Sequence, residues 1–206
     1  MFAHALKSAL LALCLIASSA LVQAKEAPKI AIFAGGCFWC VESDFDHVPG
    51  VLETVSGYSG GRTTENVTYK NHTAAGHREV VRITYDSNKI SYKKLLDIFW
   101  RSVDPTDADG QFCDRGHSYT TAIYTLNDEQ AKIAQASKKA LEKSGKLGAP
   151  IVTEISPAGP FFVAEDYHQD YHDKNPIRYT YYRFACGRDA RVEKLWGDEA
   201  MMGIKK

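Results

Sequence analysis

Two cysteines that flank an aromatic pair are the group in this sequence best suited to chemistry. They lie in the hexapeptide Gly-Gly-Cys-Phe-Trp-Cys at residues 35–40, between a strand-forming run at 30–34 and a segment with apolar residues at helical spacing. A strand, a glycine turn and a helix place Cys37 at the N-terminal end of that helix. Backbone N–H groups and the helix dipole favour an anion there, so we expect a lowered pKa and a nucleophilic thiolate at Cys37. The structural alternative is a buried core thiol.

The spacing of Cys37 and Cys40 also allows three other chemistries. A C-x-x-C pattern is typical of thiol–disulfide exchange, although the two preceding glycines and the inner Phe-Trp differ from a thioredoxin-like setting. A zinc site would need a second ligand pair, for which His168 and His172 are candidates because they lie four residues apart. A Cys–His hydrolase would need one of the seven histidines as a base, and no local pattern selects one.

A carboxylic acid on the apolar face of an expected strand could serve as a proton donor. In the segment 79–85, Glu79 is in phase with Val81, Ile83 and Tyr85. Burial raises the pKa of a carboxyl group, so Glu79 would keep its proton near neutral pH, as a general acid must. The alternative is a strand-end side chain that turns out to solvent.

A thiolate, a protonated acid and aromatic side chains together suit the reduction of an apolar, weakly basic oxide. The aromatic rings would hold a methyl or thioether group while the acid protonates the leaving oxygen. Attack of Cys37 on sulfur, with transfer of oxygen to the thiol, leaves a sulfenic acid that a second cysteine converts to a disulfide. This interpretation gives the additional cysteines a function that core packing does not.

The remaining segments predict short strands and helices that alternate only in part. The expected elements are strands at 51–58, 79–85, 119–126 and 151–155, helices capped by Ser91, Asn127 and Asp189, a short helix at 165–172, and polar loops at 62–77 and 104–118. Because adjacent strands can pair directly, this order favours an α+β two-layer sandwich over a doubly wound parallel sheet.

Composition and the N-terminus indicate the class of protein and its destination. The 206 residues carry 25 basic and 25 acidic side chains, which favours neither nucleic acid nor an anionic membrane surface as a partner. Lys7, the apolar run at 9–17 and small residues before position 25 predict a secretory signal peptide at 1–24 and not a membrane anchor. We expect cleavage after Ala24, a single domain at 25–206, and export to an oxidising compartment, the periplasm.

Several spaced motifs, in order, resemble the A-type peptide methionine sulfoxide reductases from about residue 30 to 196. The matching segments are Gly35–Trp39, Gly57–Gly61, Tyr69, Gly76–Glu79, Gly110–Gly116 and Ala164–Gln169. The resemblance implies an α+β sandwich with a plait-like, ferredoxin-like sheet, and reduction of methionine-S-sulfoxide, free or in proteins. It also implies that no metal or organic cofactor is bound. We further expect a monomer that is regenerated by a thioredoxin-like donor, or by dithiothreitol in vitro.

The same resemblance implies the chemical roles at the centre of the site. Cys37 is the nucleophile that becomes the sulfenic acid. Phe38 and Trp39 form the pocket for the substrate methyl group, and Glu79 protonates the sulfoxide oxygen.

Further residues are implied to surround that centre. Tyr69 and Tyr119 donate hydrogen bonds to the sulfoxide oxygen, and Asp114 lines the site and orients the substrate. Asp166 and His168 belong to a matching motif and are expected to support the site.

The recycling cysteine is where this chain departs from many relatives. Cys40 stands where many have glycine, and the segment 179–189 replaces a glycine-rich C-terminal tail that often carries the resolving cysteine. Cys186 and Cys40 are therefore both candidates for the resolving thiol, with Cys113 a third. Two rival functions stay open: a general disulfide oxidoreductase that uses Cys37 and Cys40, and a non-enzymatic binder of oxidised methionine.

Overall fold

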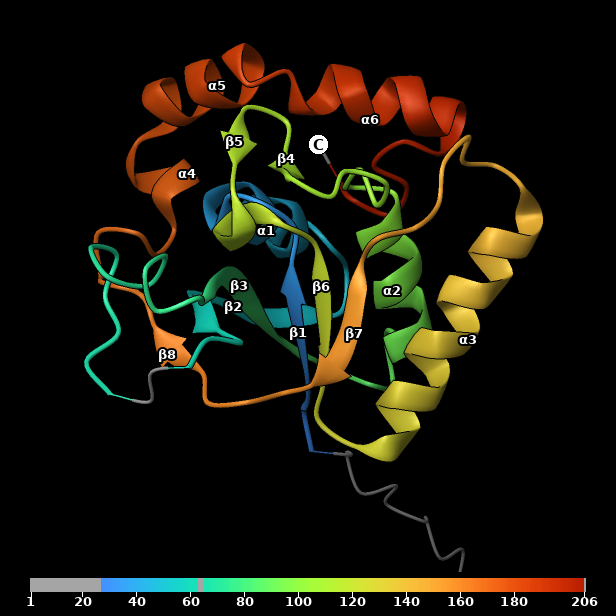
Figure 1. Cartoon of the computed structure of the whole chain (residues 1–206), viewed down its shortest axis with the longest axis horizontal. Helices are drawn as coiled ribbons and strands as arrows, with labels where there is room; N and C mark the ends of the chain where they lie inside the picture. The colour runs from blue at the N-terminus through green and yellow to red at the C-terminus, as the bar shows by residue number, and fades with distance from the viewer. Residues whose placement is uncertain (1–26, 63–64, 206) are drawn as a thin grey trace, which may run out of the picture.

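A mixed six-stranded sheet forms the centre of the molecule (Figure 1). The computed structural model describes residues 27–62 and 65–205. The strands, in the spatial order β7-β6-β1-β3-β2-β8, are β7 (Glu154–Pro157), β6 (Ala122–Thr125), β1 (Lys29–Ala34), β3 (Arg78–Tyr85), β2 (Val51–Ser59) and β8 (Phe162–Val163). Neighbouring strands are antiparallel except β6 and β7, which are parallel.

Helices surround this sheet, and two of them lie across one end of it. The helices are α1 (Phe38–Asp46), α2 (Tyr92–Trp100), α3 (Asp128–Ser144), α4 (Tyr171–Lys174), α5 (Pro176–Ala185) and α6 (Arg188–Trp196), with 3₁₀ turns η1 (His117–Tyr119) and η2 (Gly197–Glu199). Figure 1 shows α5 and α6 along the top of the molecule, over the end of β1 that leads into α1. Within the described ranges, no helix combines the length and apolar character needed to cross a membrane.

The two faces of β1 contact different layers. Ala31 and Phe33 point into the main core, where they meet apolar side chains of α1, α2 and α3. Ile32 and Ala34 point to the opposite face, where Phe161 of the connection before β8 packs against them. Alternation along one strand thus separates a helical layer from a loop-covered face. The α+β class that the sequence predicts is confirmed.

Three helix boundaries follow from capping residues that the sequence contains. The Ser91 side chain accepts a hydrogen bond from the backbone N–H of Lys94, and Asn127 accepts one from Gln130. Gly145 ends α3 in the left-handed conformation. The boundaries predicted at Ser91 and Asn127 are confirmed.

Two predicted helix boundaries are wrong, both near the C-terminus. The expected helix at 165–172 is a series of turns, because Asp170 adopts a left-handed conformation, and α4 begins only at Tyr171. Gly187, not Asp189, caps α6. Asp189 instead lies in the first turn, where its carboxylate is 2.7 Å from Nη2 of Arg183.

Other predictions need smaller corrections. The strand expected at 119–126 is confined to β6, because η1 forms its first residues, and the strand expected at 151–155 begins later, at Glu154. The loop at 104–118 contains a small hairpin of β4 (Gly110–Gln111) and β5 (Asp114–Arg115). The predicted signal peptide, 1–24, lies outside the described residues.

Candidate active site

The turn between β1 and α1 fixes Cys37 at the start of the helix. Cys37 is the N-cap residue of α1, and its carbonyl oxygen accepts hydrogen bonds from the backbone N–H groups of Cys40 and Val41 at 3.1 and 3.3 Å. Gly36 has a positive φ of 87°, and a Cβ there would lie 2.6 Å from Cβ of Gln111. The predicted position of Cys37 at a helix N-terminus is confirmed, and the glycine is required because the loop carrying Gln111 packs directly over the turn.

Glu79, the second residue of β3, reaches the start of α1. Its Oε2 atom accepts a hydrogen bond of 2.9 Å from the backbone N–H of Phe38. The side chain is 2% exposed, so the alternative of a carboxylate turned to solvent is wrong. Burial raises the pKa of Glu79 to about 8, which outweighs the stabilising hydrogen bonds to its carboxylate from Phe38 and Tyr119. Glu79 therefore holds a proton at neutral pH.

Two tyrosines and a histidine surround the acid. The Tyr119 hydroxyl hydrogen-bonds to Glu79 and to Tyr69, whose side chain is half exposed at the rim. His72 stacks on Tyr58 with ring centroids 4.7 Å apart, and its Nε2 atom lies 4.0 Å from Oε1 of Glu79. Burial lowers the pKa of His72, which favours a neutral ring. His72 lies in the segment predicted as a polar loop at 62–77, and no local pattern in the sequence connects it with Glu79.

Aromatic side chains form a cavity of about 640 Å³ next to Cys37. The residues that line it are Trp39, Tyr69, Cys113, Tyr167, His168, Tyr171, Arg178, Tyr181, Tyr182, Ala185 and Cys186. Trp39 stacks on Tyr171 with centroids 3.7 Å apart and donates a hydrogen bond of 3.0 Å from Nε1 to Nδ1 of His168. Phe38 is 1% exposed and packs behind this wall, against Tyr58 and His168. A ring wall of this kind suits an apolar side chain with a polar end.

The motif at 164–169 contributes Glu165 and His168 to the site, but not Asp166. Asp166 is exposed, whereas Glu165 accepts hydrogen bonds from the Tyr58 hydroxyl at 2.9 Å and from the Tyr69 backbone at 3.0 Å. His168 is buried in the cavity wall, and its Nε2 atom has no hydrogen-bond partner within the protein. Its Nδ1 atom is occupied by Trp39, and His172 lies 3.5 Å from Asp46, so both histidines of the zinc hypothesis are positioned by other side chains.

Cys40 contacts Cys37 one turn along α1, and both thiols are buried and free. Burial, the neighbouring Cys40 and the nearby Glu79 raise the pKa of Cys37, which outweighs a hydrogen bond from Tyr182. A lowered pKa at Cys37, as expected from the helix dipole alone, is therefore wrong for this closed site. The hydrogen bond from Cys37, together with Arg188 and Arg183, lowers the pKa of Cys40 instead. The thiol pair titrates as a unit in which Cys40 is the better anion.

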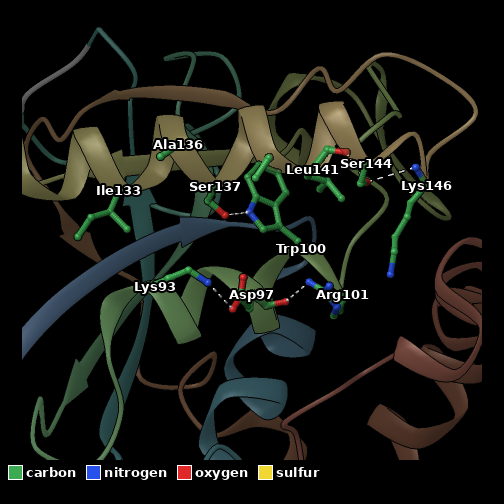
Figure 2. A pocket seen from close by; sticks show the side chains of 11 residues that line it. Lys93, Asp97, Trp100, Arg101, Ile133, Ala136, Ser137, Leu141, Ser144 and Lys146 are labelled. Atoms are coloured by element: carbon green, nitrogen blue, oxygen red, sulfur yellow. Dashed lines mark hydrogen bonds and ion pairs between the residues drawn. The ribbon is translucent and has the colours of Figure 1, made fainter.

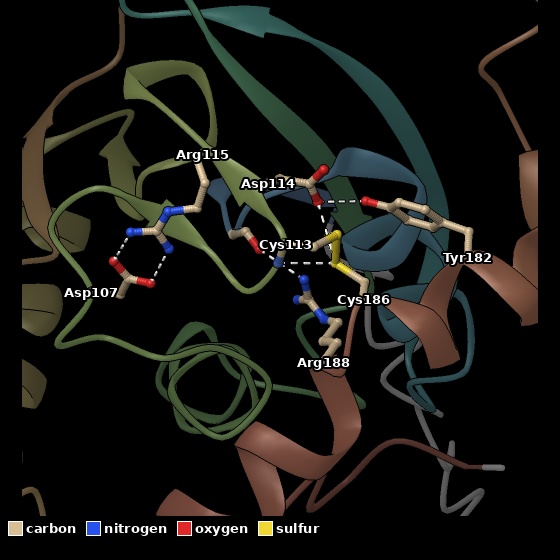
Figure 3. Close-up of a disulfide and its surroundings, with 8 residues drawn as sticks. Asp107, Cys113, Asp114, Arg115, Tyr182, Cys186 and Arg188 are labelled. Atoms are coloured by element: carbon tan, nitrogen blue, oxygen red, sulfur yellow. Dashed lines mark hydrogen bonds and ion pairs between the residues drawn. A yellow bond between two sulfur atoms is a disulfide. The ribbon is translucent and has the colours of Figure 1, made fainter.

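A disulfide joins the other two cysteines at the rim of the cavity (Figure 3). Cys113 lies in the β4–β5 hairpin and Cys186 is the C-cap of α5, with Cα atoms 4.9 Å apart. Asp114 is half-buried beside it, where its Oδ2 atom lies 3.8 Å from Sγ of Cys186 and accepts a hydrogen bond from the Tyr182 hydroxyl. Burial raises the pKa of Asp114, partly offset by that hydrogen bond. The bridge holds Asp114 and α5 together above Cys37.

We expect the double substitution Cys113→Ser and Cys186→Ser to lower the free energy of unfolding by about 2–4 kcal/mol, because the bridge closes a loop of 73 residues in the unfolded chain. Urea denaturation without reductant would measure this difference. Reduction of the Cys113–Cys186 disulfide in the parent protein should remove this difference in free energy of unfolding. Equal free energies for parent and variant without reductant would show that this bridge does not restrain the unfolded chain.

Buried arginines attach α5 and α6 to the helix that carries the thiols. Arg188 is 1% exposed and donates hydrogen bonds of 3.0 Å to the carbonyl oxygens of Gly35 and Ser102. Arg183 lies 2.8 Å from Asp44 of α1. Neither arginine could be found from the sequence, since partners 86 or more residues away leave no local pattern. They hold the C-terminal helices over the site and place positive charge near Cys40.

A second cavity, of about 550 Å³, lies between α2 and α3 (Figure 2). Its wall is largely apolar, and Trp100 crosses it to donate a hydrogen bond of 2.8 Å from Nε1 to Oγ of Ser137. None of the residues that line it belongs to the predicted site. The chemistry therefore belongs to the cavity beside Cys37.

Free thiols at a helix start, a buried protonated acid and an aromatic wall define a thiol-dependent oxidoreductase. Comparison with known proteins makes this class specific. Residues 29–200 match the family model described as peptide methionine sulfoxide reductase. Over 177 residues the chain is 58% identical to peptide methionine sulfoxide reductase MsrA 2 of Rhizobium meliloti (strain 1021), covering 86% of this chain and 88% of that protein.

Further relatives extend the agreement to solved structures. The chain is 50% identical over 174 residues to MsrA of Bacillus subtilis (strain 168), covering 84% and 98% of the two chains. Methionine sulfoxide reductase A of Corynebacterium diphtheriae superposes with a TM-score of 0.65 at 32% identity, over 75% of this chain and 78% of that one. Reduced Mxr1 from Saccharomyces cerevisiae superposes with a TM-score of 0.68 at 30% identity, over 73% of this chain and 87% of that one. The chain belongs to the A-type peptide methionine sulfoxide reductase family, and it is an oxidoreductase that reduces methionine sulfoxide.

Proposed function

We propose that the protein reduces the S epimer of methionine sulfoxide, free and in proteins, through a sulfenic acid at Cys37. The observation that carries the proposal is the position of Glu79. Its protonated carboxyl lies against the first N–H of the helix that Cys37 caps, so an acid and a nucleophile converge at one edge of an aromatic cavity. A methyl sulfoxide offers one group for each: an oxygen for the acid, a sulfur for the thiol and a methyl group for the rings.

The chemical step uses protons that the site already holds. Sulfur of Cys37 attacks the sulfoxide sulfur while Glu79 gives its proton to the oxygen, and the thiol proton of Cys37 passes to Cys40, the better anion of the pair. The hydroxyl then moves from the substrate sulfur to Cys37: a bond forms between it and the Cys37 sulfur while the substrate S–O bond and the new S–S bond break, which leaves a sulfenic acid on Cys37 and releases the thioether of methionine. Cys37 is oxidised by two electrons and the substrate is reduced by two. Neutral Glu79 also avoids placing a second negative charge beside the Cys37 thiolate.

We infer that Cys40 resolves the sulfenic acid. Its thiol already contacts Cys37, and residues three apart at a helix start have Cα atoms about 5 Å apart, within the range of disulfides. Cys186 is bonded to Cys113 and would need to be reduced first. Condensation forms the Cys37–Cys40 bond and releases water.

Mass spectrometry after one equivalent of substrate, without reductant, checks this inference. Cleavage by trypsin after Lys29 and Arg62 yields one peptide that contains both thiols. We expect that peptide to be lighter by two hydrogen atoms, with the Cys113–Cys186 pair unchanged. A peptide that links Cys37 to Cys186 or Cys113 would overturn the inference.

We propose a thioredoxin-like dithiol as the physiological donor, with dithiothreitol as its substitute in vitro, and no bound cofactor. Each step above uses only the chain's own thiols and an external dithiol. Mxr1 from yeast has been solved in complex with Trx2, which supports a donor of this kind. We also propose that the protein is exported to the periplasm, which rests on the predicted signal peptide. We propose that it acts there as a monomer.

We further propose that the central sheet is the plait-like, ferredoxin-like arrangement. The order β6-β1-β3-β2 is antiparallel throughout, and α1 and α2 follow the first and third of these strands along the chain, which supports the proposal.

A parallel assay tests the function against its rival. The protein should reduce N-acetylmethionine-S-sulfoxide amide to N-acetylmethionine amide with dithiothreitol, leave the R epimer unreduced, and fail to accelerate insulin disulfide reduction. Insulin reduction without sulfoxide turnover would favour a general disulfide oxidoreductase. Binding of the sulfoxide without release of methionine would favour a binding protein.

A further inference from the structure

The outer face of α5 carries an apolar surface that the catalytic site does not use. Ile177, Tyr181 and Phe184 are 87%, 73% and 83% exposed, and they are the most exposed large apolar side chains in the described part of the chain. Their spacing places them on one stripe of the helix, the α5 stripe, while Tyr179 and Arg183 anchor the opposite face. Isolated exposed apolar residues are common in proteins, but a continuous stripe indicates a contact surface.

The α5 stripe is continuous with the catalytic cavity. Tyr181 lines that cavity and also a shallow hollow formed with Pro176, Ile177, Thr180 and Phe184. Across the cavity, the next most exposed large apolar side chain, Tyr167, forms another part of the same wall. Apolar surface therefore extends outward from the opening through which a substrate side chain must enter.

We propose that the α5 stripe binds the residues that flank the oxidised methionine in a polypeptide substrate, with a preference for apolar flanking side chains. The proposal rests on the proposed function, since it names the substrate class of the same site. A methionine sulfoxide side chain inside the cavity leaves its own backbone at the rim, beside Tyr181. From there the next residues of an extended chain pass over Ile177 and Phe184.

The dimensions agree with an extended segment. Residues 177 and 184 are seven positions apart on a helix, which spans about 10 Å, and an extended chain covers that length with about three residues. A second copy of this chain fits the stripe less well. Side chains of this size bury about 150–250 Å² each, so three supply less than the roughly 800 Å² per partner of a standard stable interface.

The experiment compares small and peptide substrates with dithiothreitol as the reductant, so that no protein donor is involved. The small substrate is N-acetylmethionine-S-sulfoxide amide, which reaches only the cavity. The peptides are heptamers with a central methionine-S-sulfoxide: one with leucine and valine on its N-terminal side, one with them on its C-terminal side, and one with serine and glycine throughout. The enzymes are the parent, the double variant Ile177→Ser with Phe184→Ser, and Leu126→Ser.

The three proteins separate the stripe from general effects of surface change. Ile177 and Phe184 do not line the catalytic cavity, whereas Tyr181 does. The double variant therefore leaves Tyr181 unchanged. Leu126 is an exposed apolar residue, 45% exposed, at the end of β6 away from Cys37. It is the matched control for the loss of apolar surface.

We expect the parent to reduce one apolar-flanked peptide with a kcat/KM about tenfold above that of the serine-glycine peptide. The double variant should lose this advantage through a raised KM, because the stripe does not touch the reacting atoms. Its activity on the small substrate, and all activities of Leu126→Ser, should match the parent. Equal kcat/KM values of the parent for all three peptides would overturn the proposal.

Other results would assign the stripe to another partner. The double variant could lose activity on every substrate when a thioredoxin-like donor is the reductant, but not when dithiothreitol is. That result would show that the stripe binds the donor, and it would overturn the proposal. A parent dimer that the double variant abolishes would indicate a second copy and would also overturn it. If the parent reduces neither the small substrate nor any peptide, the proposed function itself fails, which is distinct from a stripe without effect.

Discussion

Replacement of Cys37 by serine is expected to lower the rate of methionine sulfoxide reduction at least about 10³-fold. The Cys37 thiol, at the N-cap of α1 beside the buried acid, both attacks sulfur and then carries the oxygen. A serine hydroxyl is a far weaker nucleophile and forms no sulfenic acid, so both halves of the cycle are lost. Formation of N-acetylmethionine amide from N-acetylmethionine-S-sulfoxide amide, measured by chromatography in reactions with excess dithiothreitol, reports the effect.

The control for this substitution is Cys40→Ser, which removes the neighbouring thiol and leaves the nucleophile. Without reductant it should still release about one equivalent of N-acetylmethionine amide per enzyme and keep the oxygen on Cys37, because resolution is blocked after the chemical step. The Cys37→Ser protein should release none. Continued turnover by Cys37→Ser would contradict the mechanism, and the absence of any burst from Cys40→Ser would show that the chemical step cannot proceed without proton transfer to Cys40.

Features that depend on a few neighbouring residues could be predicted from the sequence. The turn before Cys37, the caps at Ser91 and Asn127 and the phase of Glu79 each follow from local spacing, and the structure has them where they are expected. The predicted helix at 165–172 failed for a local reason as well. Asp170 takes a left-handed conformation that favours glycine, and no residue in that segment indicates it.

The electrostatics of the thiol pair could not be predicted in this way. The helix dipole favours an anion at Cys37, but burial, Cys40 and Glu79 together oppose it. The direction of the pKa shift of Cys37 depends on groups that come from β3 and α5 as well as α1. A motif states which residues are adjacent in the chain, whereas the pKa depends on which are adjacent in space.

The pairing of the other cysteines was equally beyond sequence reasoning. Three thiols were candidates for the resolving role, and spacing alone favoured neither Cys40 nor Cys186. In the structure Cys186 is bonded to Cys113 and Cys40 is free, because α5 ends beside the β4–β5 hairpin and brings Cys186 to Cys113. This arrangement depends on the buried contacts of Arg183 and Arg188 with α1 and the turn before it, which are long-range.

The substitution Glu79→Gln should lower kcat/KM for the sulfoxide by about 10²–10⁴-fold, the usual contribution of a positioned acid. Glutamine has nearly the same shape and can donate a hydrogen bond to the oxygen, but it has no proton to transfer. Single-turnover rates, measured by rapid quench, isolate this step from recycling. Glu42→Gln is the matched control: Glu42 is also fully buried on α1, burial also raises its pKa to about 8, and its Oε2 atom accepts a hydrogen bond from the Asp170 backbone outside the cavity.

The pH dependence of both proteins gives a second, independent measure of Glu79. As pH rises through about 8, the rate of the parent should fall because Glu79 loses the proton that it donates. The rate of Glu79→Gln should show no such fall. For stability, the carboxyl titrates at about 8 when folded and at about 4.3 when unfolded, so between these values the folded state binds more protons. The free energy of unfolding of the parent should therefore fall, relative to Glu79→Gln, as pH rises across that window, with Glu42 contributing equally to both. A Glu79→Gln single-turnover rate equal to that of the parent would show that Glu79 only supports the helix start.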